Sequence, residues 1–286
     1  MTETTGKALD FVRKLAISLG RDEIDLPAFP DVVQRLQITL ANENSSAKDV
    51  VQIMASEPLL TSKLMRMANS AALNPKGTEI DNLGAAVSRL GFNTVRSTAT
   101  AYAMHQMKQQ KELADIREQL DDIWKSSNRV AATCYVLAKK GLKQRPDEAL
   151  LAGLLHQIGR LYILMHAHRD DPELMACDEY KGVVESMQAG IGKAILESWK
   201  IPDAICEAVE GQDTLLNEGE IKGANLTSLL SAASLRNRIA TDPDVKQMHP
   251  EAEELILKVN LGESNFAELI GSHGPDIDAM QSALAA

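Results

Sequence analysis

Apolar residues recur along this chain at the three- and four-residue spacing of helices. Leu60, Leu64 and Met67 share one helical face, and a similar stripe runs through residues 1–20 before Gly20 ends it. No segment alternates apolar and polar residues for long enough to predict a strand. The pattern therefore predicts an all-α protein.

Local signals place several of the helix ends. Ser46 followed by Asp49 predicts a capping box, and Asn82 predicts an N-cap for a helix that Gly91 ends. Residues 149–168, ALLAGLLHQIGRLYILMHAH, are apolar on nearly every side. A helix of that kind lies inside a protein, so this segment predicts one central, buried helix.

Composition and charge narrow the class of protein. The chain has 286 residues, of which 44% are apolar and only 3% aromatic, as expected for helices packed through aliphatic side chains. The formal net charge is −10, from 30 basic and 40 acidic residues. That average charge would repel a phosphate backbone, so the sequence predicts that the protein does not bind nucleic acid.

The sequence predicts a cytoplasmic protein without a membrane span. Cys134, Cys177 and Cys206 are far apart and form no CxxC pair, which is typical of a reducing compartment. The first residues, MTETTGKALDFVRK, contain no hydrophobic signal-peptide core. No apolar run reaches the roughly 18 residues that a membrane helix needs.

His156, set in an apolar run, is the most specific candidate for chemistry. A histidine can bind a divalent metal beside a carboxylate, but the next residue is Gln157, a neutral amide. The alternative is a hydrogen-bonded core histidine that needs no metal. His166 and His168 precede Arg-Asp-Asp and predict a solvated helix end. No HExxH, GxSxG or GxxxxGK[ST] motif occurs.

Five segments, in order, resemble the HDOD (HD-related output) domain of bacterial signal transduction. They are LPAFPDVV (26–33), MASEPLLTSKLMRMANSAA (54–72), AVSRLGFNTVRS (86–97), LLAGLLHQIGRLYIL (150–164) and ILESWKIPDAICEAVE (195–210). The resemblance implies an HDOD domain over 21–213 in two helical lobes: an N-terminal helix bundle at about 21–108 and an HD-like lobe at about 120–213. An N-terminal helix at 1–20 precedes it. We expect residues 214–286 to form additional C-terminal helices that pack on the HD-like lobe.

The resemblance also implies where a metal site once lay. HD phosphohydrolases use a His-Asp pair, further histidines and carboxylates to hold divalent metals that activate water. At those positions this chain has Ser126, His156, Gln157, Gln188 and Gln212. A metal site normally needs three or more protein ligands, so the resemblance implies a vestigial site with no metal and no other cofactor.

Three functions follow from these expectations. The leading hypothesis is a non-catalytic regulatory module that acts through signalling proteins or a small ligand. The alternative is a phosphohydrolase of a nucleotide or cyclic dinucleotide, in which Asp121, Asp122 and Asp213 replace the missing ligands. A third is a sensor whose former metal cavity binds a small molecule, with Arg160 holding a phosphate. The sequence leaves open which protein is the partner and whether the chain forms a homodimer.

Overall fold

A computed structural model of the chain describes residues 10–15, 17, 35–36, 38–40, 42, 45–107, 111–142 and 145–285. Within the predicted helix at 1–20, residues 10–15 and 17 are helical, and the others lie outside the described residues. The segment at 26–33 also lies outside them.

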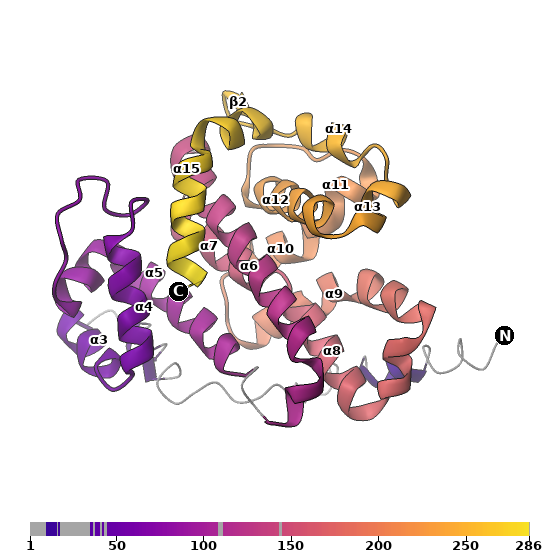
Figure 1. Ribbon diagram of the computed structural model, residues 1–286, viewed down its shortest axis with the longest axis horizontal. Coiled ribbons are helices and arrows are strands. Elements are labelled where there is room, and N and C mark those ends of the chain that lie inside the picture. Colours follow the sequence, from indigo (N-terminus) through magenta and orange to yellow (C-terminus); the bar gives the residue numbers. More distant parts are fainter. Residues whose placement is uncertain are drawn as a thin grey trace.

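The described chain is almost entirely helical, which confirms the all-α prediction (Figure 1). The α-helices are α3 (Ala47–Met54), α4 (Pro58–Asn69), α5 (Leu83–Met107), α6 (Arg117–Leu137), α7 (Pro146–Leu155), α8 (Ile158–Asp170), α9 (Asp178–Ser198), α10 (Asp203–Glu210), α11 (Thr214–Glu218), α12 (Leu226–Thr241), α13 (Pro243–Met248), α14 (Ala252–Leu257) and α15 (Phe266–Ala285). Short η segments are η1 (Lys111–Ile116), η2 (Ala138–Leu142), η3 (Pro172–Ala176) and η4 (Gly211–Asp213). Two short strands, β1 (Asn260–Leu261) and β2 (Ser264–Asn265), pair antiparallel.

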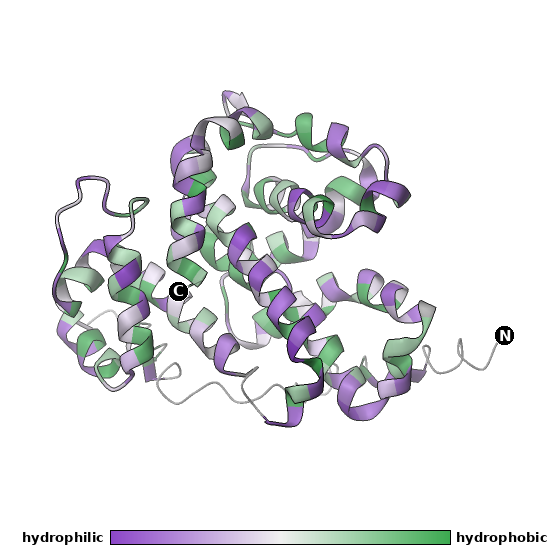
Figure 2. Cartoon of the chain, viewed as in Figure 1, coloured by the Kyte–Doolittle hydropathy of each residue, from purple (hydrophilic) through white to green (hydrophobic). Residues whose placement is uncertain are grey.

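The helices form a smaller and a larger lobe (Figure 1). Helices α3, α4 and α5 make the smaller, N-terminal lobe, and α6 and α7 pack closely at the centre of the larger one. The C-terminal helix α12 packs on α6 and α10, while α15 packs on α6 and also reaches α4 of the smaller lobe. Helix α15 therefore contacts both lobes. Hydrophilic residues cover much of the α6 face that is turned towards the viewer in Figure 2.

The local end signals act as predicted. Ser46 and Asp49 form a capping box at α3, and Asn82 accepts a hydrogen bond from the backbone N–H of Ala85 at 2.8 Å. Gly91 has a positive φ of 76°, which its lack of a side chain permits. It divides α5 into two helical parts at a kink, so the helix changes direction there.

The prediction of a single helix over 149–168 is wrong. Helix α7 ends at Leu155 and α8 starts at Ile158, with His156 and Gln157 between them. The carbonyl oxygen of His156 accepts a hydrogen bond from Gln212 Nε2 at 2.9 Å, a contact with a residue 56 positions along the chain. This side chain satisfies the backbone carbonyl where the helix is interrupted.

The predicted solvated end at His166 is also wrong. His166 is only 5% exposed, and its ring packs on that of Tyr162 with the ring centroids 4.2 Å apart. Its Nδ1 lies 3.2 Å from a carboxylate oxygen of Asp170, so the polar end is paired at the helix terminus. None of the described helices has both the length and the apolar run required to span a bilayer.

Candidate functional site

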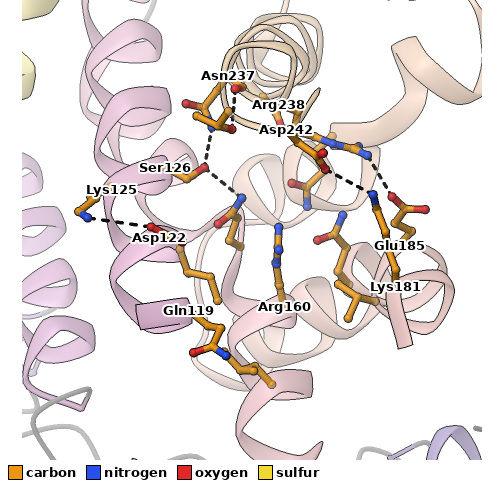
Figure 3. A pocket seen from close by; sticks show the side chains of 18 of the residues that line it. Gln119, Asp122, Lys125, Ser126, Arg160, Lys181, Glu185, Asn237, Arg238 and Asp242 are labelled. Atoms are coloured by element: carbon orange, nitrogen blue, oxygen red, sulfur yellow. Dashed lines mark hydrogen bonds and ion pairs between the residues drawn. The ribbon is translucent and has the colours of Figure 1, made fainter. Parts of the chain in front are cut away.

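A cavity of about 690 Å³ lies between α6, α8, α9 and α12. Polar side chains from separate parts of the chain line it, and Figure 3 shows several of them pointing towards its centre. The lining includes Ser126, Gln157, Arg160, Gln188, Gln212, Asn237 and Arg238. The fold therefore brings together four of the five positions expected for a vestigial metal site, along with Arg160.

Ser126 is the centre of a small hydrogen-bond network. Its Oγ accepts hydrogen bonds from Gln157 Nε2 at 3.1 Å and from Asn237 Nδ2 at 2.7 Å (Figure 3). All three side chains are less than a tenth exposed. The network consists of neutral groups only, and both amides turn their positively polarised N–H groups towards the hydroxyl oxygen.

His156 lies behind this network, since it is only 1% exposed and does not line the cavity. Its Nδ1 lies 2.7 Å from the carbonyl oxygen of Gly153, so the ring donates from Nδ1 and Nε2 is left as an acceptor. No described residue gives Nε2 a hydrogen bond. Burial lowers the pKa of His156 to about 4, and the charges of Arg160 and Arg238 act in the same direction, against the opposing Gly153 hydrogen bond. The ring is therefore neutral at pH 7.

The side chains of Gln212 and Gln188, the two remaining predicted positions, form hydrogen bonds with neighbouring backbone and side-chain groups. Gln212 donates to the backbone oxygens of His156 and Val209, each at 2.9 Å. Gln188 Nε2 donates to Asp213 at 3.3 Å, and the other oxygen of this carboxylate lies 3.0 Å from Arg238 Nη1. The Asp213 carboxylate is thus already neutralised by a cation.

Asn237 and Arg238 also line the cavity, and the sequence did not predict them as site residues. They belong to α12, outside the five segments that resemble the HDOD domain. The only local signal is the polar pair inside LRNRIA, in a helix that is otherwise largely buried. Such a pair is equally typical of an exposed helix face, so only the packing of α12 on α6 identifies it.

The HDOD domain family matches residues 26–215. The chain belongs to the HDOD family. The described part of this segment is mainly helical in both lobes.

Relatives of this HDOD chain include proteins of several bacteria. A proposed metal-dependent phosphohydrolase of Shewanella amazonensis SB2B is 26% identical with a TM-score of 0.76, and the alignment covers 98% of this chain and 99% of that one. A proposed signal transduction protein of Marinobacter aquaeolei VT8 shares the fold at 21% identity and a TM-score of 0.55, over 96% of this chain and 66% of that one. An uncharacterized protein of Treponema pallidum (strain Nichols) is 24% identical over 213 residues, 68% of this chain but only 39% of that protein's length.

The HDOD site residues do not fit a divalent metal. Among the described residues, no three His, Cys, Asp or Glu side chains come together to hold an ion. Of the carboxylates considered as substitutes, Asp122 lies 4.0 Å from Lys125 and Asp213 pairs with Arg238, while Asp121 is not in the cavity lining. Around Ser126 the donors are amide N–H groups, which repel a cation.

Proposed function

We propose that this HDOD chain is a non-catalytic regulatory module of bacterial signalling. The observation that carries the proposal is the neutral network of Ser126, Gln157 and Asn237, in which Ser126 and Gln157 stand at positions that the resemblance to HD enzymes assigns to metal ligands. The relative in Marinobacter, which is named as a signal transduction protein, supports the same class.

Electrostatics at the site support the absence of metal-dependent chemistry. A metal ion at Ser126 would displace the amide N–H groups that now bond to the hydroxyl oxygen. No negatively charged ligand at the network would then balance the charge of the ion. Arg160 and Arg238 lie close enough to depress the pKa of His156, so their positive charges would also oppose a cation. Among Ser126, His156, Gln157, Gln188 and Gln212, the five positions that the resemblance assigns to metal ligands, His156 alone carries an imidazole and none carries a carboxylate. His156 does not line the cavity.

The module has a physical connection between its cavity and the smaller lobe. Two residues before Ser126 on α6, the ring of Trp124 lies 5.0 Å from the ring centroid of His105. The ammonium group of Lys63, from α4, lies 5.0 Å from the centroid of the same indole. We propose that a change at the cavity alters this contact between lobes, and that a cytoplasmic signalling partner senses the change.

Metal stoichiometry tests the proposal first. Protein purified without chelator, and again after incubation with Mn, Fe or Zn, should retain almost no metal by elemental analysis. It should also lack phosphodiesterase activity on bis(p-nitrophenyl) phosphate. One or two tightly held ions per chain, or activity that disappears in His156→Ala, would overturn the proposal in favour of the phosphohydrolase alternative.

A Ser126→His, Gln157→Asp double variant is the matched control. It places an imidazole and a carboxylate where two side chains already approach to 3.1 Å, next to the remaining His156. We expect this variant to retain more metal than the wild type under the same washing, because an imidazole nitrogen and a carboxylate can bind the ion directly. Equal, low retention would mean that these side chains do not define the former metal position.

A further inference from the structure

The cavity lining contains more cationic than acidic side chains, and not all of its cations are paired. Its cationic lining residues are Lys125, Arg129, Arg160, Lys181 and Arg238, and its acidic ones are Asp122, Glu185 and Asp242. Arg238 pairs with Asp213 and Glu185, and Lys181 pairs with Asp242 and Asp244. Lys125 lies 4.0 Å from Asp122, so the lining cations left without an acidic partner among the described residues are two guanidiniums.

Arg160 and Arg129 are these two guanidiniums. Neither side chain forms an ion pair or hydrogen bond with any described residue, and both line the cavity. Arg160 stands in the first turn of α8 and points into the middle of the cavity, between Ser126 and Lys181 (Figure 3). Its guanidinium presents a planar set of N–H donors suited to an oxyanion with two oxygens in one plane.

The cavity also contains a buried side-chain oxygen that accepts no hydrogen bond from any described residue. One end of the Gln157 amide is bonded to Ser126, whereas the Oε1 end has no hydrogen-bond partner among the described residues. Gln157 is 7% exposed and lines the cavity, so a bound molecule can reach it. A buried amide oxygen without a partner costs about 1–3 kcal/mol, which a ligand N–H or O–H would recover.

The volume sets an upper limit on the ligand. A cavity of about 690 Å³ falls within the range of small-molecule sites, which is roughly 300–1,000 Å³. Tyr180 adds a half-buried aromatic side chain to the lining. Burial raises the pKa of its hydroxyl to about 12, so the group remains an O–H donor at neutral pH.

We propose that the cavity binds a small organic phosphate that also carries hydrogen-bond donors. Arg160 holds the phosphate, Arg129 adds charge at its side, and Gln157 Oε1 accepts a hydrogen bond from the rest of the molecule. Phosphate fits better than a single carboxylate because two uncompensated guanidiniums match its higher charge. This inference rests on the proposed function, since it needs a cavity without metal.

Calorimetric titration of the full chain, in buffer with EDTA, tests the proposal. The probes are GMP, AMP and ribose 5-phosphate. Guanosine is the control without a charged group, and inorganic phosphate is the control with few hydrogen-bond donors. We expect at least one organic phosphate to bind, and guanosine and inorganic phosphate each to bind at least roughly tenfold more weakly, since each loses one of the two kinds of contact. No binding by any organic phosphate, or equal binding of either control, would overturn the proposal.

Variants identify the residues. Arg160→Gln should weaken the binding of the organic phosphate by roughly tenfold or more, because a charge-assisted hydrogen bond is lost. Gln157→Leu should weaken organic phosphates but not inorganic phosphate. Lys193→Gln removes the same charge from α9 outside the cavity, where Lys193 pairs with Glu210, and should leave binding unchanged. An equal loss in Lys193→Gln and Arg160→Gln would refute a specific site.

EDTA is present in every titration, so a failure to bind organic phosphate overturns only this inference. The proposed function would instead be overturned by metal binding or by phosphodiesterase activity.

Discussion

His156 should make the stability of this protein depend on pH in a predictable window. The ring is 1% exposed, and burial, with Arg160 and Arg238 nearby, lowers its pKa from 6.5 to about 4. As the pH falls, the unfolded chain takes up the proton first. The contribution of the neutral ring is therefore complete above pH 6.5 and is lost as the pH falls from 6.5 to about 4. From these two pKa values, the loss between pH 7.5 and 5.5 is about 1.3 kcal/mol.

Urea denaturation at pH 7.5, 6.5 and 5.5 measures this loss against a His156→Gln variant. The substitution keeps a polar side chain but removes the titration, while every other ionisable group stays the same in both proteins. The free energy of unfolding of the wild type should fall by about 1.3 kcal/mol more than that of the variant over this range. Parallel pH profiles for the two proteins would show that His156 is not held neutral by its surroundings.

Further predictions concern helix packing and a loop clamp. A Cβ on Gly159 would collide with the carbonyl oxygen of Gln188, so Gly159→Ala should destabilise the fold by about 3 kcal/mol. Gly190, on the same pair of helices, has open space where a Cβ would lie, so Gly190→Ala should stabilise the fold by about 0.5–1 kcal/mol. Melting temperatures that shift in the same direction in both variants would contradict this packing. The side chain of Asn69 bonds both the N–H and the carbonyl of Ile80, at 2.8 Å each. Asn69→Ala should therefore cost about 2 kcal/mol and speed hydrogen exchange at the Ile80 amide, and unchanged exchange would argue against the clamp.

Features that depend on near neighbours in the chain could be read from the sequence. Ser46 and Asp49 cap α3, and Asn82 starts α5, because capping needs only a polar side chain within three residues of the exposed backbone N–H groups. Gly91 marks the kink in α5 because its positive φ is a local property of the backbone. Helical spacing of apolar residues was likewise enough to predict the all-α class.

Tertiary structure decided what depends on distant partners. Where the helix breaks after Leu155, the Gln212 side chain donates a hydrogen bond to the backbone carbonyl of His156. These two residues are 56 positions apart in the chain. Asn237 completes the network at Ser126 from 111 residues along the chain. Helical periodicity says which face of a helix is apolar but not which helix covers it, so neither contact could be predicted from spacing. The sequence by itself determined the helical class, several helix ends, the family resemblance and the residues at the positions that this resemblance assigns to metal ligands. Only the packing of α6, α8, α9, η4 and α12 decided that these residues share a cavity, that Asp213 pairs with Arg238, and that Arg160 has no ion-pair partner among the described residues, because each depends on side chains that meet only in the folded protein.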